Sequence, residues 1–141
     1  DLRGSGLQFA RLQETNFTRA HMQGTDLNHA NLQQASLIDA DLRYADLHAA
    51  NLQKAVMLKA KLCQTDLRRA VLRDATLWEV DFRDAVFSYA ELQGADLNNA
   101  DLRGADMRTA TFDEHTTLPD GTKWKPDTIL RRFTHPEEFD A

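Results

Sequence analysis

The chain has 141 residues, a formal net charge of −5 and a single cysteine. This length indicates one domain with a short appendage, and one cysteine excludes an intrachain disulfide. No apolar run approaches the length of a transmembrane helix and no signal peptide is visible, so we expect a cytoplasmic protein with no membrane insertion by this segment.

The dominant feature of the chain is a large apolar residue at every fifth position from Leu2 to Phe112. That register holds 23 residues, of which 16 are Leu, 4 are Phe and 3 are Met. Two places before each later one lies a small residue, and 17 of these 22 are Ala. A fixed short period over most of a chain indicates a repeat architecture.

A period of five fits neither regular secondary structure. Five residues advance an α-helix by about 140°, so the apolar residues would scatter around its axis. In a flat strand, residues five apart point to opposite faces. A chain that turns a corner every five residues removes the conflict, because each straight segment then points its central residue inward. We therefore predict a filled solenoid, with the central residue and the Ala two places before it inside.

The repeated string reads Ala-(Asp/Asn)-Leu-x-x, as at 40–44 and 95–99. This pattern resembles the pentapeptide repeat family. The resemblance implies an all-β solenoid, a right-handed quadrilateral parallel β-helix with four pentapeptides to each coil. Residues 1–112 would then form about 5.6 coils, a rod about 27 Å long at the usual spacing of paired strands. Because Asp1 lies in mid-repeat, we also expect the sequence to be a piece of a longer protein.

Residues 20 apart would stack in such a coil, so the outer faces can be written as ladders. We expect the Asp–Arg face to be a solvated, self-compensating surface. On the glutamine face, stacked amides are expected to hydrogen-bond along the ladder and to add stability. The Asp–Arg face carries Asp1, Arg3, Asp41, Arg43, Asp81, Arg83, Asp101 and Arg103, and the glutamine face carries Gln13, Gln33, Gln53, Arg73 and Gln93.

The acidic face stacks Asp26, Asp46 and Asp66, with Asp106 two coils further on and Val86 between. Carboxylates about 5 Å apart could imitate the phosphates of a nucleic-acid duplex. The alternative, which we favour, is that each Asp accepts hydrogen bonds from its own corner, as in an Asx turn.

The apolar face carries Ile38, Leu58 and Trp78 on three consecutive coils, with Val56 beside them. A contiguous exposed apolar stripe marks an interface, and Trp is enriched at binding hot spots. The alternative is a set of incidental or covered surface residues.

After Phe112 the period stops, so residues 113–141 are predicted to be a C-terminal loop and helical cap. The string 118–122 with Trp124 resembles endings of cyanobacterial members of the family. A turn is expected at Pro119-Asp120-Gly121, a two-turn helix from Pro126, and a second helix start at 134–138. The cap would cover the exposed end of the rod, although a tail that docks a partner is the alternative. The residues expected to fold over the last coil are Leu118, Trp124, Ile129, Leu130 and Phe133.

The sequence carries no signature of catalysis or of a cofactor. There is no glycine-rich phosphate loop, Cys63 is alone, and the five His residues lack metal-ligand spacing. Residues 1–112 hold 15 acids and 13 bases, so we expect no direct nucleic-acid binding. We predict a non-catalytic protein-interaction or scaffolding module that has a protein partner and can self-associate.

Two alternatives remain at this stage. Some members of the family mimic DNA and bind DNA gyrase, but the nearly neutral rod and the interrupted acidic face depart from that pattern. The other alternative is an accessory repeat domain of a larger membrane or signalling protein.

Overall fold

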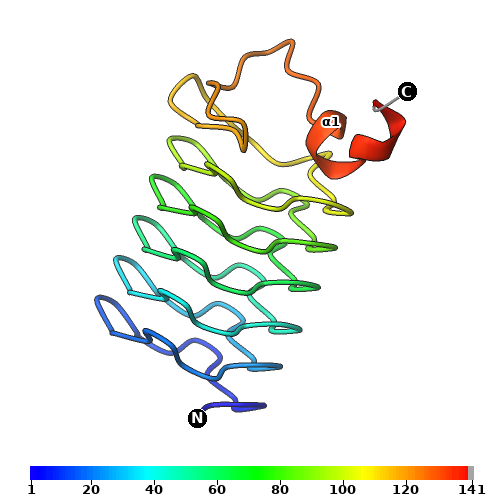
Figure 1. Cartoon of the computed structure of the whole chain (residues 1–141). Coiled ribbons are helices and arrows are strands. Elements are labelled where there is room, and N and C mark those ends of the chain that lie inside the picture. The colour runs from blue at the N-terminus through cyan, green and yellow to red at the C-terminus, as the bar shows by residue number, and fades with distance from the viewer. Residues whose placement is uncertain (140–141) are drawn as a thin grey trace.

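A computed structural model describes residues 1–139 as a stack of four-sided coils (Figure 1). Parallel bridges join residues 20 apart, from Gly6–Asp26 through Glu91–Thr111. Each face of a coil contributes one isolated bridge rather than a longer strand. The described helices are α1 (Arg131–Thr134) and the 3-10 helix η1 (Pro136–Glu138), both at the C-terminal end of the rod. Neither has the length or apolarity needed to cross a bilayer.

Each pentapeptide ends in a tight turn that makes the corner of the coil. In the second pentapeptide, the Ala10 N–H donates to the Leu7 carbonyl at 3.1 Å. The second residue after every centre has a positive φ, from Gly4 through Gly104, and 17 of these corner residues are not glycine. One positive φ in the turn fits type II geometry. The left-handed conformation costs a non-glycine residue about 1–2 kcal/mol, so hydrogen bonds between coils must hold each corner.

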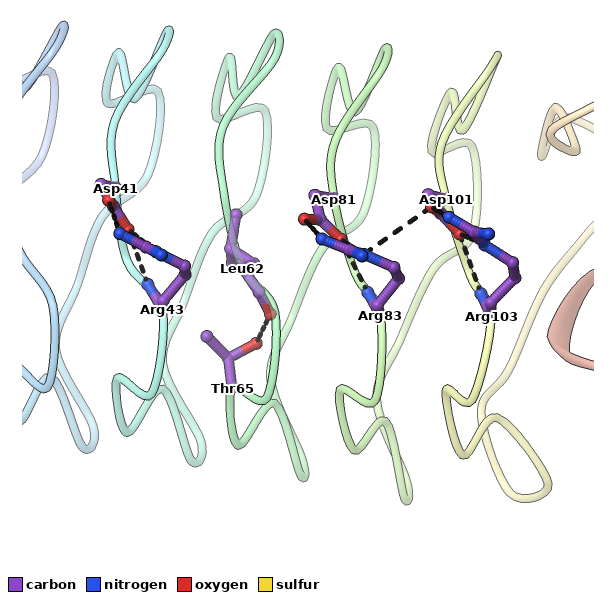
Figure 2. A network of polar contacts seen from close by, with 8 residues as sticks. All are labelled: Asp41, Arg43, Leu62, Thr65, Asp81, Arg83, Asp101 and Arg103. Atoms are coloured by element: carbon purple, nitrogen blue, oxygen red, sulfur yellow. Dashed lines mark hydrogen bonds and ion pairs between the residues drawn. The ribbon is translucent and has the colours of Figure 1, made fainter.

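The interior confirms the predicted inward positions. The centres from Met22 to Leu97 are fully buried, and the small residues between them are at most 2% exposed. Where Thr replaces Ala in the buried coils, its hydroxyl donates to the carbonyl three residues earlier, as Thr25 does to Met22 and Thr65 to Leu62, both at 2.7 Å (Figure 2 shows Thr65). The first coil, in contrast, is only partly buried at Leu2, Leu7, Leu12 and Phe17.

The last coil continues beyond Phe112, which corrects the predicted boundary. Asp96 pairs with Thr117, which is 21 residues later, and Leu118 is only 1% exposed. One residue has therefore been inserted. The Asp113 carboxylate accommodates it by accepting a hydrogen bond from the Gly94 N–H at 2.9 Å, where a backbone carbonyl serves in the coils below. Leu118 is thus a further repeat centre rather than part of the cap.

A hairpin closes the rod above this coil. The predicted turn is present: the Gly121 N–H donates to the Leu118 carbonyl at 2.9 Å. Beyond the turn, Lys123 pairs with Thr117 in an antiparallel bridge. Trp124 then stacks on Phe112, with ring centroids 6.0 Å apart. The hairpin therefore covers both a backbone edge and an apolar centre.

The helical part of the cap is shorter than the sequence predicts. Instead of a two-turn helix from Pro126, the chain forms one turn of α-helix in α1 followed by η1. Phe133 packs against the core, and the Thr134 carbonyl accepts a hydrogen bond from the Gly104 N–H at 2.7 Å. Ile129 is 60% exposed, so its assignment to the inward side of the cap is wrong. The last two residues of the predicted cap, 140–141, lie outside the described residues.

Candidate functional site

Carboxylates of the acidic face are bound to their own corners. The bridges Asp26–Asp46 and Asp46–Asp66 place the three in the expected register. The Oδ1 atoms of Asp46 and Asp66 accept hydrogen bonds from the backbone N–H two residues later, at 2.8 and 3.0 Å, and Asp26 does the same. Each Asp thus satisfies a backbone donor at the turn, which is the local role that the Asx interpretation predicts.

Neighbouring side chains neutralise part of this acidic face. The Asp66 carboxylate lies 2.5 Å from the Arg68 guanidinium, and Asp106 lies 2.8 Å from Arg108. Burial alone would raise the pKa of Asp66, but the hydrogen bonds from Arg68 hold it below its usual value. A ladder that is broken by Val86 and paired with arginines makes a poor copy of a phosphate backbone.

The Asp–Arg face repeats one bidentate ion pair along the rod (Figure 2). Arg83 donates to both carboxylate oxygens of Asp81, at 2.8 and 2.7 Å, and also lies 3.8 Å from Asp101 on the next coil. Asp41 and Asp101 have equivalent partners in Arg43 and Arg103. Hydrogen bonds from these arginine side chains are the main cause that lowers the pKa of Asp41, Asp81 and Asp101.

These shifts predict a loss of stability in acid. A carboxyl whose pKa is lower in the folded than in the unfolded chain stabilises the fold above the unfolded value of about 3.9. That contribution disappears as the pH falls through the folded pKa. We therefore expect Asp81→Asn to be less stable at neutral pH and to lose less stability below about pH 4. Urea unfolding at a series of pH values, with Asp127→Asn in the exposed tail as control, tests this; parallel pH curves for Asp81→Asn and wild type would contradict it.

The glutamine face is only partly a hydrogen-bonded ladder. The Gln33 amide donates to Gln53 at 3.3 Å, but Arg73 then forms an ion pair with Glu91 at 2.6 Å. Gln93 donates instead to the Thr111 hydroxyl at 2.9 Å. These contacts link adjacent coils, which gives the face a role in stability.

The apolar face differs from the other three because its first four coils, from Asn16 to Trp78, carry no charged outward side chain. Trp78 is 44% exposed, and Ile38, Leu58 and Val56 are half-buried beside it. The bridges Ser36–Val56 and Val56–Thr76 fix the coils that carry them in consecutive order. Over eight outward positions on four consecutive coils no side chain is ionisable, whereas the fifth coil carries Asp96 on this face. The eight residues are Asn16, Thr18, Ser36, Ile38, Val56, Leu58, Thr76 and Trp78.

Exposed aromatic residues at the corners escaped the sequence interpretation. Phe9 is 71% exposed and stacks on His29 at 5.0 Å, and Arg69 lies over the ring of Tyr89, which is 64% exposed. Tyr44 is exposed at another corner. All three aromatic residues occupy the second position after a centre. That position makes the corner, so its side chains belong to the outer surface as much as those of the first position do.

Groups capable of chemistry do not converge among residues 1–139. No cluster of three or more His, Cys, Asp or Glu side chains there could hold a metal ion. His29 and His48 meet edge to face at 5.6 Å without a third ligand. Burial raises the pKa of the Cys63 thiol, which disfavours the reactive thiolate.

A cavity of about 440 Å³ lies between the last coil and α1. Its charged groups, Arg108 and Arg131, form ion pairs with Asp106 and Glu138. The Thr134 hydroxyl and the His135 ring share a hydrogen bond of 2.9 Å at its wall. This wall offers an ordinary polar contact between neighbours in the chain rather than a nucleophile oriented by a base.

Comparison with solved structures finds the same fold in a cyanobacterial protein. The crystal structure of alr5209, a pentapeptide repeat protein from Nostoc PCC 7120, has a TM-score of 0.58 and 26% identity over 82% of this chain and 84% of its own. HetL from Nostoc sp. strain PCC 7120, a pentapeptide repeat protein involved in heterocyst differentiation regulation, has a TM-score of 0.45. It is 26% identical over 85% of this chain and 79% of its own. QnrB1, a plasmid-mediated fluoroquinolone resistance protein, has a TM-score of 0.35 and 19% identity over 88% of this chain and 83% of its own. No curated protein sequence matches the chain.

The family comparison rests on the repeat itself. The sequence model for pentapeptide repeats, which spans eight copies, matches residues 1–34, 30–69 and 65–104. These matches cover most of the rod and end before the hairpin and cap. Together with the stacked coils and the likeness to alr5209, they confirm the right-handed quadrilateral β-helix. The chain belongs to the pentapeptide repeat family.

Proposed function

We propose that this chain is a non-catalytic protein-interaction module that binds its partner through the apolar face. The observation that carries the proposal is the run of eight uncharged outward positions with exposed Trp78 among them. Cores of protein interfaces are depleted of charge and enriched in aromatic residues, whereas charged groups collect at the rim. The other three faces of the rod carry ionised side chains on most coils.

Rigidity supports this use of the face. Every coil is tied to the next by backbone hydrogen bonds, so that Leu37 donates to the Val56 carbonyl at 2.7 Å and Asp39 to the Leu58 carbonyl at 2.9 Å. The backbone of such a surface is already ordered before a partner arrives. Binding therefore costs little ordering entropy, which raises affinity for a given contact area.

The DNA-mimic alternative has less support. Its signal would be a continuous unpaired acidic face, yet Asp66 and Asp106 form ion pairs with arginines and Val86 separates them. A supercoiling assay with DNA gyrase offers a direct comparison. We expect no inhibition at protein concentrations equal to the enzyme, and potent inhibition would reverse the ranking of the two proposals.

Substitution of the exposed apolar residues is the test of the proposed function. We expect Leu58→Asp/Trp78→Asp to fold with a melting temperature close to wild type, because both side chains point outward. Burying two new carboxylates in an interface should weaken partner binding at least about a hundredfold. Both proteins serve as baits in the source cell, and retained proteins are compared quantitatively.

A matched control separates the face from exposed aromatic residues in general. Tyr44→Asp/Tyr89→Asp introduces the same charge at exposed rings on other parts of the rod. The control should retain the partner that the apolar-face variant loses. An identical set of retained proteins for all three baits would refute the proposed role of the face.

A further inference from the structure

We infer that the apolar face binds a second copy of this chain in antiparallel orientation; this inference rests on the proposed function of that face. It comes from the corner beside the face, where Arg19, Asp39, Lys59 and Glu79 stand on four consecutive coils. Their charges alternate in sign along the rod. Adjacent pairs are only loosely matched within one chain, since Arg19–Asp39 spans 4.0 Å and Lys59–Glu79 spans 3.7 Å.

A column of charges that alternate in sign is complementary to the same column running in the opposite direction. When two copies meet face to face around a two-fold axis perpendicular to the rods, each corner column meets the same column running the other way. With the axis midway between Asp39 and Lys59, Asp39 lies opposite Lys59 of the second copy. Arg19 then lies opposite Glu79 of the second copy. Symmetry repeats both contacts, so four opposite-charge pairs flank the apolar contact.

Other arrangements of two copies are disfavoured by the same residues. Moving the axis by half a coil, to the level of Lys59, places Lys59 against itself and Asp39 against Glu79. Running the two rods parallel brings this corner against the opposite one, where Lys59 meets Lys54 and Glu79 meets Asp74. These two repulsive contacts outnumber the one attractive contact, between Arg19 and Glu14. Like charges in close contact oppose association at an interface, so these two arrangements are disfavoured. The antiparallel register centred between Asp39 and Lys59 is the one that pairs all four charges of the corner column.

The apolar side chains fit the selected register. Ile38 then packs against Leu58 of the second copy, on both sides of the axis. Trp78 lies opposite Thr18, whose hydroxyl can accept a hydrogen bond from the indole N–H. The face has the charge-free centre and charged rim of a protein interface.

The contact is small, which sets the expected affinity. In this register four coils of each copy overlap, which makes a contact about 19 Å long at the spacing of paired strands. An interface of that length lies at the low end of specific protein contacts, so we expect weak and reversible association. At the opposite corner, Glu14 lies opposite Asp74 of the second copy. Removing this repulsion with Glu14→Lys should tighten the dimer.

Single charge reversals test both the partner and the orientation. Asp39→Lys and Lys59→Glu each turn two attractive pairs across the axis into repulsive ones. Sedimentation velocity over a concentration series should give each variant a dissociation constant at least about tenfold above wild type. Both substitutions are compatible with the fold, because Lys54 and Glu14 already occupy corner positions with φ of 58° and 57°.

Mixing the two variants supplies the decisive comparison. In a mixed dimer, the lysine introduced at position 39 of one copy meets the glutamate introduced at position 59 of the other. An equimolar mixture of Asp39→Lys and Lys59→Glu should therefore associate as wild type does. The double variant Asp39→Lys/Lys59→Glu should also dimerise by itself. Single variants that dimerise like wild type, or a mixture no tighter than its components, would overturn the antiparallel second copy.

Failure of this inference is distinguishable from failure of the proposed function. A wild-type chain that stays monomeric at every concentration would overturn the second copy as occupant. If, in that case, the wild-type bait retains a different protein that the Leu58→Asp/Trp78→Asp bait does not retain, the proposed function of the apolar face stands. If that bait loses nothing either, both proposals fall.

Discussion

Leu52→Asp is expected to unfold the middle of the rod. Leu52 is fully buried, and the coils above and below it leave no route by which a carboxylate could reach water. The substitution removes a leucine from a packed core and adds an unpaired charge, at a cost of at least about 4 kcal/mol. This is a large share of the stability of a typical domain. Circular dichroism melts should show loss of the cooperative transition or a large fall in its midpoint.

The neighbouring corner provides the control for this substitution. Lys54→Asp places the same carboxylate two residues away at an exposed position. Asp already occupies such corners at Asp39, Asp74 and Asp84. We expect its melting temperature to stay close to wild type. An unchanged midpoint for Leu52→Asp would mean that the fifth-position residues do not face inward.

Deletion of residues 122–141 is expected to cause aggregation. It removes Lys123, which pairs with Thr117 in the antiparallel bridge, and uncovers Phe112 by removing Trp124. It also removes Phe133 from the end of the core. An unpaired sheet edge next to exposed apolar surface is a template for association between chains. Size-exclusion chromatography and light scattering should report large species at concentrations where the full chain is a monomer or dimer.

The damage from this deletion should be local. Repeat proteins hold together through contacts between neighbouring units, so terminal coils fray before central ones. Hydrogen exchange should therefore accelerate in residues 97–118 and remain slow in residues 40–60. Ile129→Ser, which changes an exposed side chain of the tail, should leave both readouts unchanged. A deletion protein that remains soluble with an unchanged exchange pattern would favour a docking role for the tail over a capping role.

The rod was predictable because its pattern leaves few ways to bury the apolar residues. A residue at every fifth position is incompatible with helix and strand, and the Ala two places earlier permits close coils. The end of the rod was harder to predict. Asp113 uses its side chain where other coils use a backbone carbonyl, which lets one extra residue enter and moves the next centre to Leu118. A strict five-residue count stops at Phe112, because it does not allow for the inserted residue.

The cap was predicted in outline and missed in detail. Apolar residues at short spacing suggested a two-turn helix that would bury Ile129, yet α1 has four residues and Ile129 faces solvent. Polar contacts decide the conformation here. Thr128 accepts a hydrogen bond from the Lys125 N–H, and Arg132 reaches Asp120 in the hairpin. Side-chain contacts between distant segments are not encoded in local periodicity.

The spacing of 20 residues predicted which side chains stack on each face, but it did not predict the hydrogen bonds and ion pairs that these side chains form. Stacking of Asp26, Asp46 and Asp66 could be counted from the sequence. Their hydrogen bonds to corner backbone groups and the ion pair of Asp66 with Arg68 required coordinates. The corner column beside the apolar face was visible in the sequence as well. Its relevance to the apolar face depends on the structure, in which this corner borders that face.

The most direct test of the central claim is photocross-linking from two exposed aromatic positions. A photoreactive phenylalanine analogue replaces Trp78 on the apolar face in one protein and Tyr89 at a remote corner in another. Both side chains are exposed, so both proteins should fold and react equally well with solvent-borne quenchers. We predict specific protein adducts from position 78 and none from position 89. Adducts from position 89 alone, or the same adducts from both positions, would contradict an interaction surface centred on the apolar face.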